Sequence, residues 1–162
     1  MLYKIIDDND EKSIYFENTK CIEFGCGCNY YVLKADEPYL KVTTNSGYFN
    51  DAIIFNDYIC IGLYTDGLRI VNLNDFSIKN LDIDGYFGYF YINNDELYVL
   101  GCCNVTALDK DINIKWKSPN IAEDGILFND VINDIMHIQC EMDPPGGWVK
   151  RQIDLRTGSV VG

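Results

Sequence analysis

The chain of 162 residues has few basic residues, a single histidine and no long apolar run. Thirteen Lys and Arg stand against 25 Asp and Glu, which gives a formal net charge of −12 at pH 7. A surface of this charge repels the phosphate backbone of nucleic acids, so we expect no nucleic-acid partner. No apolar run approaches the roughly 18–20 residues that a membrane-spanning helix needs, so we expect no membrane partner either.

The N-terminal stretch "MLYKIIDDNDEK" lacks the features of a secretory signal. It soon becomes acidic and has neither a longer apolar core nor a small-residue cleavage site. The cysteines number seven, and an odd count argues against a fully paired disulfide framework. Reduced thiols are typical of the cytosol, so the sequence predicts a cytoplasmic protein.

What the sequence does contain is an internal repeat. "GCGCNYYVLKAD" at 25–36 returns as "GCCNVTALDKD" at 101–111, with Asn29 and Asn104 lying 75 residues apart. A related phrase, "GLRIVNLND", starts at Gly67, and "WVKRQIDLRTGSVV" at 148–161 is a last copy. The segments before these phrases are pairs of apolar runs around Asn-Asp, as in "AIIFNDYICIGLY" and "YFYINNDELYVLG". Asn and Asp suit hairpin turns because they tolerate left-handed backbone conformations.

The repeat predicts one all-β domain over 1–162 with four units of four short antiparallel strands, at about 13–45, 51–83, 88–118 and 125–161. Self-similarity near 37 residues, with β-branched or aromatic residues in every run, is typical of β-propeller blades. The runs "YICIGLY" and "LYVLGCC" are apolar at both alternating positions, as expected for sheets covered on both faces. We therefore expect a small or irregular β-propeller, with a β-sandwich as the alternative fold.

Two of these phrases carry a resemblance to a known family. "QIDLRTGSVV" and "TALDKDINIKW" resemble the phrase joining the third and fourth strands in propeller repeats of the pyrroloquinoline-quinone (PQQ) type, which runs apolar-x-Asp-x-x-x-Gly-x-apolar-x-Trp. The resemblance implies blade architecture and does not imply the cofactor, so we expect none. Trp116 is the only tryptophan and Gly158 the only glycine at their places in the phrase, which predicts an irregular or open ring.

No group of catalytic or metal-ligating residue types in the sequence predicts an enzyme or a metal site. Cys26, Cys28, Cys102 and Cys103 have gaps of one or no residue, too short for typical structural zinc sites. We expect them to pack in the core as small apolar residues. His137 is the only histidine, and without further partners we expect it to be buried or on an edge strand. Acid pairs such as Asp109 and Asp111 are interpreted as solvated turn residues.

Two stretches are candidates for a contact surface. "GYFGYFY" at 85–91 places five aromatics in seven residues, which suit either the core or a ligand platform. "EMDPPGGWVKR" at 141–151 predicts a stiff hairpin longer than its counterparts, and binding often resides in such loops. The residues selected as partner-binding candidates are Glu141, Asp143, Trp148, Asp95, Glu96 and Tyr89.

The sequence therefore favours a non-enzymatic, protein-binding module. Its small size, acidity and lack of a catalytic set resemble the profile of bacterial toxin-immunity proteins, which implies a basic toxin domain as partner. An acidic surface attracts such a partner and speeds the encounter. The alternatives are a propeller-like protein that binds a small molecule or a glycan, and a hydrolase that uses paired carboxylates.

Overall fold

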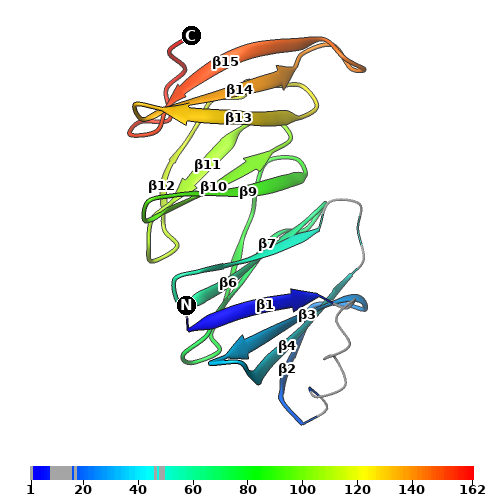
Figure 1. The fold of residues 1–162 in the computed structure, drawn as a ribbon. Helices are drawn as coiled ribbons and strands as arrows, with labels where there is room; N and C mark the ends of the chain where they lie inside the picture. Colours follow the sequence, from blue (N-terminus) through cyan, green and yellow to red (C-terminus); the bar gives the residue numbers. More distant parts are fainter. Residues whose placement is uncertain (1, 8–15, 17, 46, 48–49) are drawn as a thin grey trace.

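The structure is a computed structural model that describes residues 2–7, 16, 18–45, 47 and 50–162. Within these residues fifteen strands form four sheets. The sheets stack one upon another in chain order, with the first and last at opposite ends of an open arc (Figure 1). The expected all-β fold of blade-like units is confirmed, and the described arc does not close into a ring.

The second and third sheets are simple meanders in which each strand pairs antiparallel with the next. The second consists of β5 (Asp51–Phe55), β6 (Tyr58–Leu63), β7 (Gly67–Asn72) and β8 (Ile78–Leu81). The third consists of β9 (Phe87–Asn93), β10 (Glu96–Gly101), β11 (Val105–Leu108) and β12 (Ile114–Lys117). These two sheets follow the predicted pattern of strand, turn, strand, loop, strand, turn and strand.

The first sheet has a different topology, with the order β1-β3-β4-β2. Its strands are β1 (Tyr3–Asp7), β2 (Lys20–Glu23), β3 (Gly27–Lys34) and β4 (Glu37–Asn45). β2 pairs in parallel with β4, and β1, which precedes the predicted unit 13–45, pairs with β3. Residues 13–15 and 17 of that unit lie outside the described residues.

The fourth sheet contains β13 (Ile126–Ile132), β14 (Ile135–Glu141) and β15 (Trp148–Asp154). The C-terminal residues run beside β15, where Val160 forms a bridge with Ile153. The backbone N–H of Val161 also donates to the carbonyl of Gln152 at 2.9 Å. Residues 159–162 therefore follow the edge of this sheet where a fourth strand was predicted.

Apolar side chains fill the spaces between neighbouring sheets. On β6, Ile59 and Ile61 pack toward the first sheet, whereas Cys60 packs toward the third. On β10, Val99 packs toward the second sheet and Leu100 toward the fourth. All five are at most 1% exposed, so the middle strands are covered on both faces, as their apolar sequences predict.

The two end sheets differ in their outer faces. On the first sheet, Phe16 covers Tyr31 and Leu33, and the rings of Phe16 and Tyr31 lie 4.8 Å apart. On the fourth sheet, the outer face carries the exposed Leu127 together with the pair formed by His137 and Asp130. One end of the arc is thus covered by the chain itself, and the other has a mixed polar and apolar surface.

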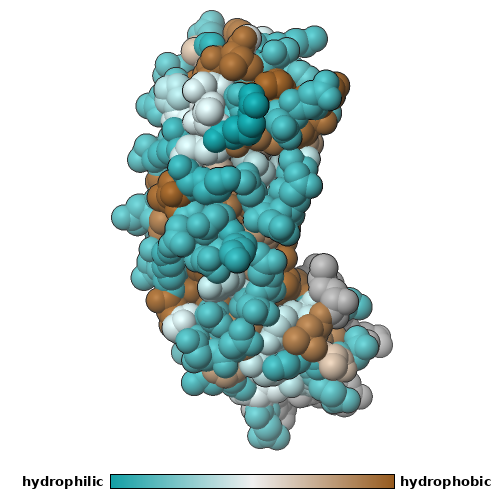
Figure 2. All heavy atoms as spheres, turned by 90° about the vertical axis from the view of Figure 1, so that its left-hand side faces the viewer, coloured by the Kyte–Doolittle hydropathy of each residue, from teal (hydrophilic) through white to brown (hydrophobic). Residues whose placement is uncertain are grey.

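The strands also define two long sides of the arc. The turn end is the side of the hairpins that follow β3, β5, β7, β9, β11 and β13, together with residues 155–158. The loop end is the opposite side, with residues 24–27, 64–66, 102–104 and 142–147 and the connections between sheets. Figure 1 shows the turn end on its left, and Figure 2 shows that hydrophilic residues cover most of it.

Candidate functional site

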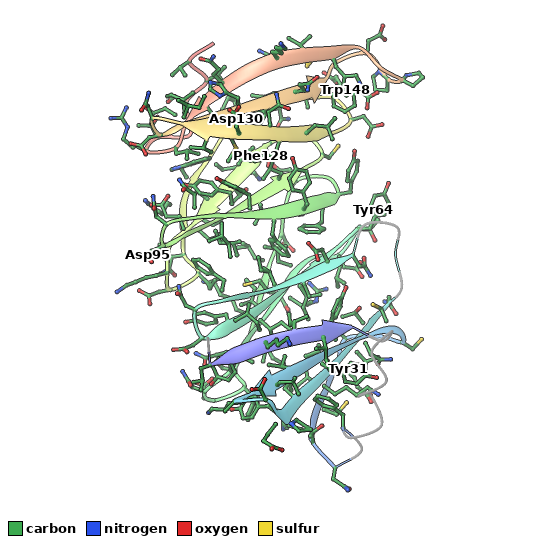
Figure 3. All side chains as sticks on the ribbon, in the orientation of Figure 1. Tyr31, Tyr64, Asp95, Phe128, Asp130 and Trp148 are labelled. Atoms are coloured by element: carbon green, nitrogen blue, oxygen red, sulfur yellow. The ribbon has the colours of Figure 1, made fainter. Side chains whose placement is uncertain are left out.

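The six candidate residues do not form one site. Asp95 and Glu96 lie at the turn end, whereas Trp148 and the hairpin of Glu141 and Asp143 lie at the loop end (Figure 3). The sixth residue, Tyr89 of β9, is half-buried and packs against the core between the third and fourth sheets. Its hydroxyl oxygen accepts a hydrogen bond from the backbone N–H of Phe128. Burial raises the pKa of Tyr89 to about 12, so the structure places this side chain in the junction between two sheets.

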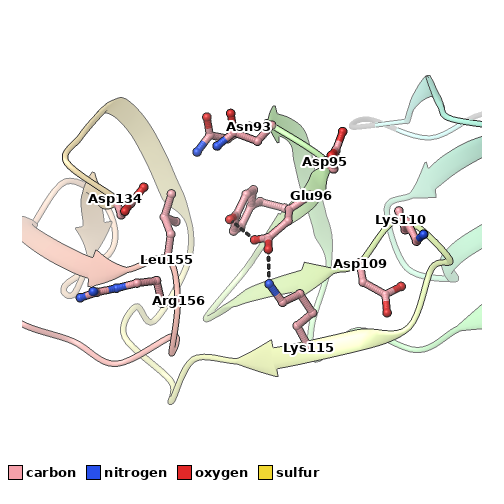
Figure 4. Close-up of a pocket in the computed structure, with 11 residues that line it drawn as sticks. Asn93, Asp95, Glu96, Asp109, Lys110, Lys115, Asp134, Leu155 and Arg156 are labelled. Atoms are coloured by element: carbon pink, nitrogen blue, oxygen red, sulfur yellow. Dashed lines mark hydrogen bonds and ion pairs between the residues drawn. The ribbon is translucent and has the colours of Figure 1, made fainter.

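A cleft of about 470 Å³ opens at the turn end between the third and fourth sheets (Figure 4). One ion pair joins two of its lining residues, and a second joins a lining residue to a neighbour outside the cleft. Glu96 pairs with Lys115 and accepts a hydrogen bond from the Tyr98 hydroxyl, and Arg156 pairs with Asp154 at 2.6 Å. Burial acts to raise the pKa of Glu96, but the bonds from Lys115 and Tyr98 outweigh it and lower the pKa.

Other acids of the turn end build the turns themselves. Asp109 accepts hydrogen bonds from the backbone N–H groups of Asp111 at 2.9 Å and Asn113 at 2.8 Å. Asp154 accepts from the N–H of Arg156 at 2.8 Å, and Asp75 from that of Ser77, also at 2.8 Å. The side chain of Arg156 first, and then its backbone N–H, lowers the pKa of Asp154; the side chain and then the backbone of Ser77 lower that of Asp75; and the backbone bond from Asn113 lowers that of Asp109. These three acids therefore act as turn formers, as was predicted for Asp109.

The same turns attach each sheet to the preceding one. Phe76, Ile112 and Gly158 occupy equivalent places and all have left-handed backbone, with φ of 60°, 60° and 72°. The ring of Phe76 lies 5.4 Å from that of Tyr39 in the first sheet, and Ile112 is fully buried in the cluster shared with the second.

At Gly158 the preceding sheet supplies the contact. A Cβ atom there would lie 2.5 Å from the ring of Trp116, whose Nε1 donates to the carbonyl of Leu155 at 2.7 Å. Trp116 thus docks the fourth sheet onto the third. A glycine is needed only in the unit where the docking tryptophan comes this close.

The loop end has no such repeated turn. Its described connections, residues 24–27, 47, 50, 64–66, 82–86, 102–104, 118–125 and 142–147, contain six acidic residues and no Lys or Arg. Asp84 pairs with Lys117 of β12 at 2.5 Å, and this pairing lowers the pKa of the Asp84 carboxyl. In the described part of the chain, Glu123, Asp124 and Asp143 are exposed and form no ion pair. The basic groups at this end come from the adjoining strands: Arg69 donates to the carbonyl of Asp66 at 2.7 Å and Arg151 to that of Ile121 at 3.1 Å.

Three aromatic side chains follow one another along this acidic edge. Tyr64 stacks on Tyr86 with ring centroids 5.1 Å apart, and the Tyr86 hydroxyl donates to the carbonyl of Asp124 at 2.9 Å. Gly125 separates Tyr86 from Trp148: a Cβ atom on it would lie 3.2 Å from the Tyr86 hydroxyl oxygen and 3.9 Å from the Trp148 ring. We call Tyr64, Tyr86 and Trp148 the aromatic row. It crosses the second, third and fourth sheets, and Trp148 is 40% exposed.

The neighbours of the aromatic row are fixed by backbone hydrogen bonds. The N–H of Gly125 donates to the carbonyl of Cys102 at 2.8 Å, and the N–H of Glu141 donates to the carbonyl of Gly125 at 3.0 Å. In the proline hairpin, the N–H of Gly147 donates to the carbonyl of Asp143 at 3.1 Å, and Glu141 accepts a bond from the N–H of Gly146. These bonds hold the row between two well-defined loops.

A pocket of about 260 Å³ adjoins Tyr64. Leu63 and Tyr64 supply apolar lining, and Asn45, Asn50 and Asp66 supply polar groups. Asn50 is held in place because its amide Nδ2 donates to the carbonyl of Asn45 at 2.6 Å and its Oδ1 accepts from the N–H of Tyr64 at 3.2 Å. The pocket thus combines an apolar wall with an acidic residue.

The seven cysteines are all free thiols, but they do not all pack in the core. Cys60 and Cys140 are buried, whereas Cys26 is exposed and Cys28, Cys102 and Cys103 are half-buried. Core packing, which we expected for these four, is therefore wrong for Cys26 and incomplete for the others. Burial, together with the contact with Cys103, raises the pKa of Cys102 to about 12. Among the described residues no group of three or more metal-ligating side chains gathers.

His137 lies half-buried on β14, which is the middle strand of the fourth sheet and not an edge strand. Its Nδ1 contacts a carboxylate oxygen of Asp130 on the outer face of that sheet. Within the residues described, no helix is long and apolar enough to span a membrane.

Comparison with known proteins shows the fold. No protein family and no curated protein matches the chain. The computationally designed Ika8 protein superimposes with a TM-score of 0.59 at 7% identity, covering 83% of this chain and 42% of that one. The designed Ika4 protein gives a TM-score of 0.53 at 7% identity, covering 74% of this chain and 75% of that one.

The WD40 domain of Neurospora crassa Pan2 also superimposes, with a TM-score of 0.53 at 13% identity. The match covers 83% of this chain and 45% of that one. The chain thus spans less than half the length of Ika8 and of the Pan2 domain. These likenesses show a blade-repeat, propeller-like fold.

Proposed function

We propose that this chain is a non-enzymatic binding module for a basic protein, and that it acts in the bacterial cytoplasm as the immunity protein of a cognate toxin domain. The observation that carries the proposal is the charge of the arc. Acidic residues occupy both long sides, the net charge is −12, and the loop-end connections contain no basic residue. A surface of one sign favours rapid encounter with a partner of the opposite sign.

Shape supports the same function. The arc has an exposed tryptophan and a stacked tyrosine pair on one edge, and aromatic side chains are enriched at the centres of protein interfaces. The only histidine of the sequence contacts an aspartate on the outer face of the fourth sheet, and in the turn-end cleft Glu96 is already paired with Lys115. This arrangement suits recognition better than catalysis.

The test starts from the gene next to that of this chain, which is expected to encode a large secreted protein with a basic C-terminal domain. That domain, once purified, should bind the chain, and the association rate should fall steeply between 0.05 and 0.5 M salt, because surface charges are screened over about 10 Å at 0.1 M. Co-expression of the chain should also restore growth to a bacterial host arrested by the domain.

Binding that ignores salt, or growth arrest that the chain does not relieve, would contradict the proposal. Cytochrome c, a basic protein of unrelated shape, is the control for non-specific attraction. The alternative function, recognition of a small molecule or glycan, rests on the 470 Å³ cleft at the turn end. A glycan array would favour it if one sugar class bound and its binding were lost on Glu96→Gln.

A further inference from the structure

We infer that the loop end is the contact surface for the basic partner, with the aromatic row at its centre and a Lys or Arg side chain of the partner in the pocket beside Tyr64. This inference rests on the proposed function and adds to it where the partner binds and which side chain it presents. The occupant is a protein segment with basic side chains around an apolar centre.

The first argument is the distribution of basic residues: Lys110 and Arg156 lie in the turns of the turn end, whereas the loop-end connections contain no Lys or Arg. At the turn end, Asp109 and Asp154 accept backbone hydrogen bonds, and Glu96 pairs with Lys115. At the loop end, the exposed Glu123, Asp124 and Asp143 make no ion pair within the described residues. Asp95 and Asp134 of the turn end are exposed and without an ion pair in the described part of the chain too, but the cleft that they line also contains Lys110, Lys115 and Arg156. The loop-end connections present their carboxylates without a basic residue in the same connection, which favours the approach of a partner cation.

The second argument is the presence of aromatic surface among these acids. Hot spots of protein interfaces are enriched in Trp and Tyr and are surrounded by polar residues that exclude water. Trp148 is 40% exposed, and the stacked Tyr64 and Tyr86 extend the same surface across two further sheets. Because Gly125 has no side chain, nothing protrudes between Tyr86 and Trp148. The aromatic row thus offers apolar area within an acidic rim.

The third argument is the pocket beside Tyr64. Its volume of about 260 Å³ suits one long side chain. The methylene groups of Lys or Arg would pack against Leu63 and Tyr64, and the charged head would meet Asp66 and the amides of Asn45 and Asn50. The Asn50 amide already bonds to Asn45 and Tyr64, so the Asp66 carboxylate is the group that favours a cation over an acidic or purely apolar side chain.

The test compares matched variants in surface plasmon resonance against the basic domain. Asp66→Lys and Asp124→Lys at the loop end should each slow association at least threefold. Asp95→Lys and Asp111→Lys at the turn end make the same change of charge, and their association rates should stay within about twofold of the wild-type rate. Trp148→Ala should raise Kd tenfold or more through faster dissociation, as loss of a hot-spot aromatic does, and Trp148→Phe should recover part of the loss.

A probe of defined chemistry tests the pocket independently. In an NMR titration, a decalysine peptide should shift the backbone amides of residues 64–66 and 123–125 before those of 94–95 and 109–111, and Asp66→Asn should weaken the shifts at 64–66.

The outcomes distinguish a failure of the proposed function from a failure of the assigned surface. If the wild-type chain does not bind the domain, the proposed function fails. If it binds with steep salt dependence but the turn-end reversals weaken binding as much as the loop-end ones, the function stands and the assigned surface is wrong. Circular dichroism melts identify any variant that has lost its fold. If Trp148→Ala does not fold, the two aspartate reversals at each end still allow the two sides to be compared.

Discussion

The two long sides of the arc are made from the same repeat but use their acidic residues differently. At the turn end, equivalent turns recur in successive sheets, and Asp75, Asp109 and Asp154 bond to their own backbone. At the loop end, the connections differ in length and sequence, and their acids remain exposed beside the aromatic row.

The comparison shows which side of a repeat is free to vary. The turn end attaches each sheet to the preceding one through Phe76, Ile112 or the contact between Gly158 and Trp116, so its sequence is bound to the fold. The loop end is joined across sheets mainly by backbone hydrogen bonds, such as those from the N–H of Phe87 to the carbonyl of Tyr64 and from the N–H of Gly125 to the carbonyl of Cys102, and it also contains a proline hairpin and a tyrosine pair.

The largest effect should come from removing the docking tryptophan of the turn end. Trp116→Ala leaves a cavity in the core between the third and fourth sheets and removes the Nε1 hydrogen bond to Leu155. We expect a loss of about 4 kcal/mol in unfolding free energy, measured by urea denaturation. Trp148→Ala, the same change at the loop end, should lower the unfolding free energy by less than about 1 kcal/mol. Equal losses would show that both tryptophans serve the fold.

Two glycines with left-handed backbone give a finer comparison. Gly158→Ala at the turn end should cost about 3 kcal/mol, because the new methyl group would lie 2.5 Å from Trp116 in addition to the backbone strain at φ 72°. Gly146→Ala at the loop end, where φ is 102° and the space is open, should cost about 1 kcal/mol from backbone strain alone. Thermal melts of the two variants measure the difference, and the reverse order would refute the tight docking at Gly158.

Three turn-end aspartates should contribute to the pH dependence of stability, in addition to Asp84 of the loop end, whose pKa is lowered by Lys117. The pKa of Asp75, Asp109 and Asp154 is lowered by hydrogen bonds in the folded state, so their stabilisation is present above the unfolded value of about 3.9 and is lost as pH falls through the folded pKa. Melting temperature should thus drop below about pH 4. Replacing all three with Asn should flatten that drop, whereas Asp143→Asn at the loop end should keep the wild-type profile. An unchanged profile in the triple variant would contradict the assignment.

The smallest effect concerns the thiols. In the native protein Ellman's reagent should label Cys26 at the loop end and Cys21 on β2 quickly, because both are exposed. Cys60 and Cys140 should react only after denaturation, since they are buried and burial raises their pKa to about 12 and about 11. Mass spectrometry of the labelled peptides identifies each site. Rapid labelling of Cys60 would mean that the second and third sheets separate readily.

Much of the fold could be predicted from the sequence because short local patterns mark the strands and turns of each repeat. Asn-Asp pairs such as Asn94 and Asp95 mark the turns, and apolar residues at both alternating positions of β6 and β10 mark sheets covered on both faces. The parallel pairing of β2 with β4 could not be predicted, because it depends on contacts distant along the chain. The left-handed backbone at Phe76 and Ile112 could not be predicted either, since apolar residues rarely adopt this conformation.

The sequence alone predicted only part of the candidate site. Trp148 and the proline hairpin were selected because their composition is unusual. Tyr86 lies in the aromatic stretch 85–91 that the sequence indicates as a candidate, but Tyr64 was missed, because the two tyrosines come together only when the second and third sheets stack. The Gly-Cys phrases gave a signal for the loop end that was interpreted as core packing, and the exposure of Cys26 corrects this.

The central claim, that the loop end binds and the turn end supports, is tested most directly by hydrogen exchange of the chain alone and in complex with the basic domain. The account predicts slower exchange on binding in residues 64–66, 118–125 and 142–148. It predicts no change in the turns at 94–95, 109–113 and 133–134. Protection confined to the turns, with the loop-end residues unchanged, would contradict it.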